Sequence, residues 1–152
     1  MLKVIFFAIG VYIVNTLVKG FFCELSLKFA TDTSRRLFLV NVMTLPIADE
    51  VTRYLSYLWS PLISLGFTMI TTIVETILGF GIGVKLRKRA AVILGLIQGV
   101  VHPVGFVLMD RIPGMGGLFL ALLLHMTWND LVVNKTLDDI MVTEGGDSNE
   151  SN

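Results

Sequence analysis

The sequence predicts an all-α fold, a polytopic bundle of about five transmembrane helices. Hydrophobic side chains make up 54% of the 152 residues and charged ones only 16%, and the mean hydropathy of +0.77 is far above that of an ordinary soluble domain. The apolar residues gather in five stretches, each close to the roughly 20 residues that a helix needs to cross a bilayer. Composition therefore predicts an integral membrane protein.

The five predicted spans follow one another with short connections. They cover residues 2–18, 37–57, 62–84, 90–109 and 116–133. The first resembles a signal sequence because a lysine precedes its apolar run, but bulky and charged residues occupy the place of a cleavage site, and we treat it as a span. Residues 1–134 form the predicted transmembrane domain. Residues 135–152 form an acidic tail that we expect to be disordered.

Basic residues predict the orientation of the chain. Cytoplasmic loops collect Lys and Arg, and residues 85–89 contain four of them. With this loop inside, the protein is multi-pass, its N-terminus lies outside and its C-terminus lies in the cytoplasm. The net charge of zero, with a basic loop and an acidic tail, gives no support for nucleic-acid binding. The single cysteine, Cys23, excludes an intramolecular disulfide and a cysteine-based zinc motif.

Four of the predicted spans carry ionisable side chains at a similar depth. Hydrocarbon tolerates such groups only where they face a polar cavity or one another. At about 1.5 Å per residue they lie roughly 15 to 20 Å from the cytoplasmic flank, in a core about 30 Å thick. We therefore expect them to converge on one polar site. They are Asp49, Glu50 and Arg53 in the second span, Glu75 in the third, His102 in the fourth and His125 in the fifth.

Helical spacing brings the charged residues of the second span together. Asp49 and Glu50 lie four and three residues before Arg53, so either carboxylate can reach the guanidinium. Pro46 precedes them by about one turn, where it removes a backbone hydrogen bond and can kink the helix, which admits water or substrate. A different arrangement is also open, in which the span ends near Pro46 and residues 48–57 lie on the membrane surface as an amphipathic helix.

Four short motifs on successive spans resemble those of the CAAX-protease and bacteriocin-processing (CPBP) proteases and of their PrsW-type and YhfC-type relatives. The resemblance covers about residues 45–133. It implies an intramembrane endopeptidase of the glutamate type, whose substrate is a membrane-embedded or membrane-anchored peptide or protein. The motifs are Asp49-Glu50-Val51-Thr52-Arg53, then Glu75, then His102, and finally His125-Met126-Thr127-Trp128-Asn129.

The resemblance also implies a role for each residue of these motifs. Glu50 or Asp49 would deprotonate a water molecule, and His102 would help to hold it. His125 and Asn129, four residues apart on one helix face, would donate hydrogen bonds to the developing oxyanion. The remaining two roles are those of Arg53, which would orient the acids, and Glu75, which would share their proton or complete the coordination of the water.

The glutamate-type mechanism requires no cofactor, but a zinc site is an alternative use of the same groups. Two imidazoles and one carboxylate suit zinc, and an acid of the second span would then serve as the base. The zinc ligands in this alternative are Glu75, His102 and His125.

Two functions other than proteolysis stay open. A small proton- or cation-coupled transporter would use Glu75, His102 and His125 as a proton relay or a cation site. A catalytically lapsed immunity or adaptor protein would keep the fold without the activity. Asp49, which stands where the family motif has Glu, fits this second alternative.

Overall fold

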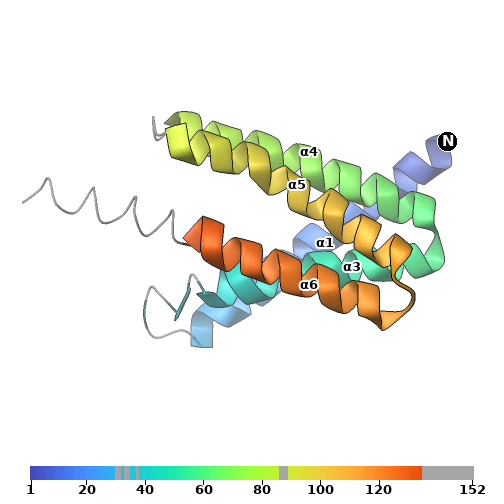
Figure 1. Ribbon diagram of the computed structural model, residues 1–152, viewed down its shortest axis with the longest axis horizontal. Coiled ribbons are helices and arrows are strands. Elements are labelled where there is room, and N and C mark those ends of the chain that lie inside the picture. Colours follow the sequence, from blue (N-terminus) through green and yellow to red (C-terminus); the bar gives the residue numbers. More distant parts are fainter. Residues whose placement is uncertain (30–31, 33–34, 37, 86–88, 135–152) are drawn as a thin grey trace, which may run out of the picture.

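The structure is a computed structural model that describes residues 1–29, 32, 35–36, 38–85 and 89–134 (Figure 1). The regular elements among these residues are all helices, which confirms the predicted all-α class. Residues 86–88 of the predicted cytoplasmic loop and the predicted tail at residues 135–152 lie outside the described residues. The cytoplasmic position of the loop and the disorder of the tail stay predictions.

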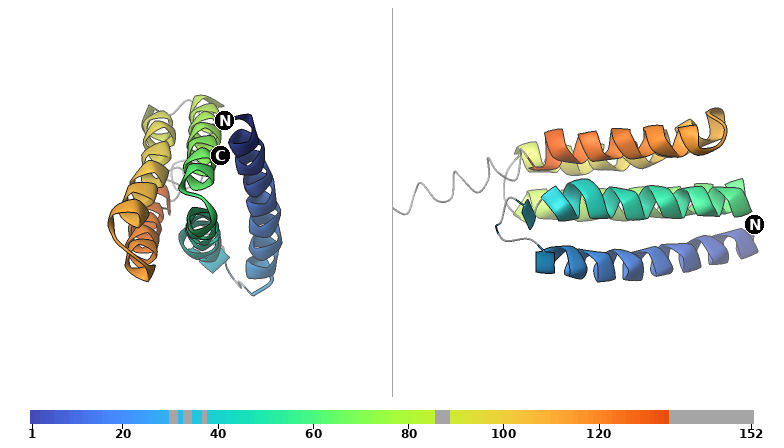
Figure 2. Two further views of the ribbon diagram at one scale, coloured as in Figure 1. Left: turned by 90° about the vertical axis from the view of Figure 1, so that its right-hand side faces the viewer. Right: turned by 90° about the horizontal axis from the view of Figure 1, so that it is seen from below.

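The described helices lie in three layers (Figure 2). α5 and α6 form the first layer, α4 and α3 form the second, and α1 forms the third, packed against the middle layer. Two π-helical segments, η1 and η2, continue directly into α3 and out of α6. The bounds are α1 Leu2–Phe29, η1 Phe38–Thr44, α3 Leu45–Trp59, α4 Pro61–Lys85, α5 Arg89–Arg111, α6 Met115–Trp128 and η2 Asn129–Asn134.

Proline and glycine set the turns between neighbouring helices. Ser60, which separates α3 from α4, is extended at φ −161° and ψ 119°, as the residue before a proline is expected to be. Its N–H donates to the carbonyl of Ser56 at 2.8 Å and so ends α3. Gly114, between α5 and α6, has a φ of +67°, a left-handed conformation that glycine adopts without strain.

Two of the predicted spans have different limits in the structure. The first ends at residue 18 in the prediction, whereas α1 continues to Phe29, because Lys19 finds ion-pair partners inside the bundle and does not end the helix. The second span is divided between η1 and α3. Pro46 lies in the first turn of α3, where the π-helical segment η1 changes into the α-helix.

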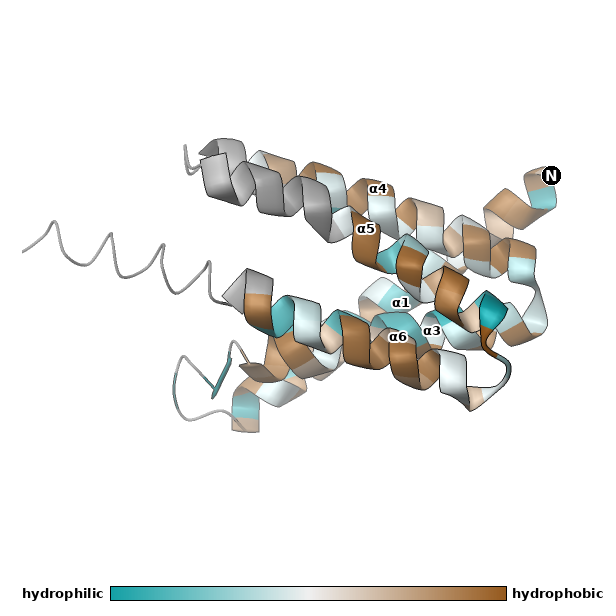
Figure 3. Cartoon of the chain, in the orientation of Figure 1, coloured by the Kyte–Doolittle hydropathy of each residue, from teal (hydrophilic) through white to brown (hydrophobic). Residues whose placement is uncertain are grey.

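Burial is inverted relative to a soluble protein. Among the described residues, eleven polar or charged side chains are buried, against eight apolar ones. Many large apolar side chains are instead exposed; Phe6 and Leu17, for example, are 78% and 69% exposed. Figure 3 shows hydrophobic residues along each of the helices. Two described helices are long and apolar enough to cross a membrane, Leu2–Phe29 and the segment Pro61–Leu78 of α4. A membrane protein is therefore indicated, and the five spans stay a prediction.

Candidate functional site

The charged residues of α3 lie in the interior of the bundle. Asp49, Glu50 and Arg53 are 1%, 0% and 0% exposed, which contradicts the alternative that residues 48–57 lie on a membrane surface. Consecutive helical residues project about 100° apart. Asp49 and Glu50 therefore face different neighbouring helices, and the acid pair is divided between two groups of partners.

Glu50 belongs to a group that joins α3, α4 and α6. Arg53, three residues later on α3, donates from Nη1 to Oε2 of Glu50 and from Nε to Thr68 Oγ1 on α4 at 3.0 Å. The other oxygen of Glu50, Oε1, lies 2.8 Å from Nδ1 of His125 on α6. Both carboxylate oxygens are thus engaged, as a fully buried ion pair requires.

Asp49 faces α1 and belongs to a second group. Its Oδ1 lies 2.6 Å from Nζ of Lys19 and accepts a hydrogen bond of 2.8 Å from Nδ2 of Asn15. The Lys19 ammonium also lies 3.4 Å from Oε1 of Glu75 on α4. Thr52 donates to Oδ1 of Asn15 at 2.9 Å and fixes the orientation of that amide. A single cation therefore bridges two acids on different helices.

His102 on α5 links the two groups. Its Nδ1 lies 2.7 Å from Nη2 of Arg53, and because a guanidinium only donates hydrogen bonds, Nδ1 must accept. The ring proton is then on Nε2, which donates to Oε2 of Glu75 at 2.7 Å. The His102 and His125 rings meet edge to face, with centroids 4.9 Å apart. His102 is thereby fixed as a neutral ring of one tautomer.

A glycine allows α5 to approach the buried ion pair. A Cβ added at Gly105 would lie 3.0 Å from Oε2 of Glu50 and 3.1 Å from Nη1 of Arg53. Both distances are tighter than ordinary contacts of a Cβ atom. Gly105 lies three residues after His102, so the same stretch of α5 supplies an imidazole and makes room for the Glu50–Arg53 pair.

Asn129 lies directly after α6 and contacts η1, and its role in holding an oxyanion stays a prediction. Asn129 is 4% exposed, and its Nδ2 donates to the carbonyl of Asn41 in η1 at 2.7 Å. This hydrogen bond links the C-terminal end of α6 to η1. The structure therefore joins by hydrogen bonds and ion pairs the six other predicted residues, which are Asp49, Glu50, Arg53, Glu75, His102 and His125.

Sequence reasoning missed the contribution of α1. Lys19 lies just beyond the predicted first span at residues 2–18, and Asn15, inside that span, has no predicted site role. The available signal was their spacing: an amide and an ammonium four residues apart share one face of a largely apolar helix. Ser64 was also missed; its hydroxyl donates to the backbone carbonyl of Arg53 at 3.0 Å.

One set of described side chains has the spacing of metal ligands. Single ligand atoms of Asp49, His102 and His125 lie within 4.8 Å of one another, so Asp49 takes the place that the zinc alternative gave to Glu75. Both ring nitrogens of His102 are already in hydrogen bonds, and a metal would displace one of them. Two hydrogen bonds from one water molecule span about 4.6 Å. A water molecule that bonds His102 would displace the same hydrogen bond, so the set fits a metal ion at the cost of one hydrogen bond, or a water molecule held by Asp49 and His125 alone.

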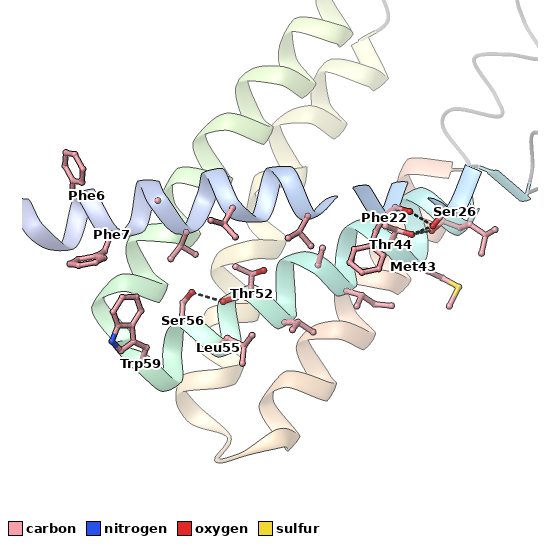
Figure 4. Close-up of a pocket in the computed structure, with 18 residues that line it drawn as sticks. Phe6, Phe7, Phe22, Ser26, Met43, Thr44, Thr52, Leu55, Ser56 and Trp59 are labelled. Atoms are coloured by element: carbon pink, nitrogen blue, oxygen red, sulfur yellow. Dashed lines mark hydrogen bonds between the residues drawn. The ribbon is translucent and has the colours of Figure 1, made fainter. Parts of the chain in front are cut away.

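An open groove of about 1080 Å³ lies between α1 and α3, beside the Asp49 group (Figure 4). Phe7 and Trp59 meet edge to face at one end, and Phe22 and Met43 lie at the other. Thr52 lines the groove, and its hydroxyl bonds the Asn15 amide that holds Asp49. Two successive hydrogen bonds, from Thr52 to Asn15 and from Asn15 to Asp49, therefore connect the groove wall to the buried carboxylate.

No protein-family model, curated protein or solved structure matches this chain. The resemblance to the CPBP and PrsW-type proteases thus rests on the motifs quoted above. The function has to be inferred from the geometry of the polar cluster and from the surface that surrounds it.

Proposed function

We propose that the chain is a multi-pass membrane protein with five spans, its N-terminus outside and its C-terminus in the cytoplasm. The support is the inverted burial, because an aqueous solvent would leave a continuous apolar surface uncovered along the helices. α3 and α6 contain only 15 and 14 residues, but their π-helical continuations lengthen them to 22 and 20. At about 1.5 Å per residue, both then approach the 30 Å of a bilayer core.

We propose further that the polar cluster is the active site of an intramembrane endopeptidase similar to the CPBP and PrsW-type proteases. The observation that carries this proposal is the meeting of acids, cations and imidazoles from five helices in the interior of an apolar bundle. Burying so many ionisable groups is costly. Stability alone gives no reason to keep them, whereas hydrolysis within a membrane requires them.

Charge balance assigns a proton to His125. The cluster has three carboxylates and two permanent cations, which leaves one negative charge (2 − 3 = −1) when both histidines are neutral. A further proton removes this buried charge. His102 cannot take it, because Nδ1 accepts from Arg53. His125 can, because Nδ1 then donates to Glu50 and Nε2 becomes a second donor.

In the proposed reaction, a water molecule sits between Asp49 and His125, beside the His102 ring. Asp49 takes a proton from this water as its oxygen attacks the carbonyl carbon of the substrate. The Nε2–H group of His125 donates to the oxyanion that forms. The C–N bond then breaks as the Asp49 carboxylic acid returns the proton to the leaving amine. Glu50 and Arg53 orient His125 and His102, and Glu75 keeps the His102 tautomer.

The experiment is cleavage of a fluorogenic, membrane-anchored peptide by the purified chain in proteoliposomes. We expect Asp49→Asn and His125→Gln each to reduce cleavage by about 100-fold or more, with thermal unfolding still cooperative. Glu24→Gln, which changes an exposed acid of α1 paired with Lys28 at 3.6 Å, is the matched control and should cleave as the wild type does. Cleavage that persists in both site variants would overturn the proposal.

A proton-coupled transporter is the second candidate, favoured by one observation. Glu75 is 24% exposed at its side chain and begins a hydrogen-bonded path through His102 to Arg53 and Glu50. Arg53 interrupts this path as a proton relay, because a guanidinium does not release its protons. A proton flux across liposomes that Glu75→Gln abolishes, without peptide cleavage in the wild type, would replace the protease proposal with this one.

A further inference from the structure

We propose that α1 supplies two positioning residues, Lys19 and Asn15, that hold the acids of the site in place. The inference deepens the proposed function and rests on it for the identity of the reaction. It assigns a role to a helix that lies outside the four motif-bearing spans.

The contacts of Lys19 are those of a site residue. Its side chain is 17% exposed, and its ammonium contacts Asp49 at 2.6 Å and Glu75 at 3.4 Å. Lys28, nine residues later on the same helix, is 68% exposed and contacts Glu24 at 3.6 Å. A buried ammonium that bridges two helices is expensive to maintain, whereas an exposed pair such as Lys28–Glu24 contributes little.

Lys19 acts on the site through both acids. Asp49 and Glu75 carry like charges and would repel each other without a cation between them. The ammonium draws the two carboxylates together, and Glu75 then accepts the Nε2–H of His102. Asn15 adds a donor to the same Oδ1 of Asp49 that Lys19 contacts. The orientation of Asp49 and the tautomer of His102 thus both depend on α1.

The place of α1 depends in turn on these polar contacts. On its α4 side the helix makes a close apolar contact, in which a Cβ at Gly66 would lie 2.8 Å from Cβ of Ala8. On its other side, the open groove separates α1 from α3. Figure 4 shows α1 and α3 on opposite sides of this groove. Lys19 and Asn15 are therefore the connection between α1 and the acid of α3.

The experiment compares Lys19→Met, Lys19→Arg and Asn15→Leu, with Lys28→Met as the matched control on the same helix. The first readout needs no activity: the rate at which N-ethylmaleimide alkylates Cys23, the single thiol, which lies one turn from Lys19 and is half-buried. We expect severalfold faster alkylation in Lys19→Met, because α1 loses its ion pairs with Asp49 and Glu75 near Cys23, and the wild-type rate in Lys19→Arg and Lys28→Met.

The second readout separates positioning from folding. We expect Lys19→Met and Asn15→Leu to lower kcat for the anchored peptide by about 10- to 100-fold while KM changes by less than about twofold, and Lys19→Arg to recover most of kcat because it keeps a cation with several donors. Unchanged alkylation and unchanged kcat in Lys19→Met would overturn the inference. Faster alkylation in a chain whose wild type cleaves no peptide would support the role of Lys19 and reject the proposed function.

Discussion

At the scale of single residues, Arg53 has the most partners in the cluster. Its three nitrogens contact Glu50, His102 and Thr68, which lie on three helices. Each guanidinium nitrogen therefore has an acceptor, as a buried charge requires. Removing one member of such a buried pair leaves the other charge without compensation, and this makes the pair sensitive to single substitutions.

Arg53→Met is expected to lower the free energy of unfolding by about 3 to 5 kcal/mol, because the buried cluster loses a cation and Oε2 of Glu50 loses its hydrogen-bond donor. The control is Arg111→Met. Arg111 is 80% exposed and lies 3.6 Å from Asp110, so its loss should change stability by less than about 1 kcal/mol. Thermal unfolding in detergent measures both, and equal stabilities of the two variants would contradict the described network.

Gly105→Ala tests the close approach of α5 to the ion pair. The new Cβ would force the Glu50–Arg53 pair to move by a few tenths of an ångström, and overpacking of this kind costs about 1 to 3 kcal/mol. Gly20→Ala, where a Cβ meets nothing within 4 Å, should instead stabilise α1 by about 0.5 to 1 kcal/mol. A thermal shift of the same sign in both variants would speak against the close contact.

At the scale of elements, α1 and α3 differ from the limits read from hydropathy. A lysine after an apolar run is usually a flanking residue, and hydropathy contains no information about partners on other helices. Lys19 lies inside α1 because Asp49 and Glu75 compensate its charge. Pro46 lies in the first turn of α3, and the division of the second span near this residue was among the arrangements that the sequence left open.

Gly66→Ala is expected to displace α1 from α4. The added Cβ would lie 2.8 Å from Cβ of Ala8, and neither atom is at the end of a flexible chain, so the helices themselves must separate. The displacement should lengthen the contacts of Lys19 and raise the alkylation rate of Cys23. Gly20→Ala on the free face of the same helix should leave that rate unchanged, and a similar increase there would contradict the assigned contact.

At the scale of the whole molecule, a cluster of charged side chains is buried among the described residues, and large apolar side chains are exposed. Among the described residues, the buried apolar cluster consists of Met109, Leu118 and Ala121, with Tyr54, Leu108 and Leu122 partly buried against it. A cluster of this size does not hold a bundle together in water. In a bilayer the same distribution is favourable, because lipid covers the outer surfaces while the polar groups satisfy one another.

Membrane insertion gives the prediction at this scale. The full chain should stay with the membrane fraction after extraction at alkaline pH, and reporters fused to its two ends should lie on opposite sides, because an odd number of spans separates the termini. Release of the chain by alkali would reject the membrane assignment. Reporters on one side would reject the five spans and leave the polar cluster unaffected.

The sequence by itself determined the helical class, the buried ionisable residues other than Lys19, and the reach of Arg53 to an acid of its own helix, because helical periodicity relates residues of the same helix. The structure chose Glu50 over Asp49 as the partner of Arg53. The tertiary structure decided the pairs between helices: Asp49 with Lys19, Glu50 with His125, and Glu75 with His102. Such pairs depend on how far each helix is rotated and displaced against its neighbours. That rotation is fixed by packing over the whole interface, and no local pattern in the sequence specifies it.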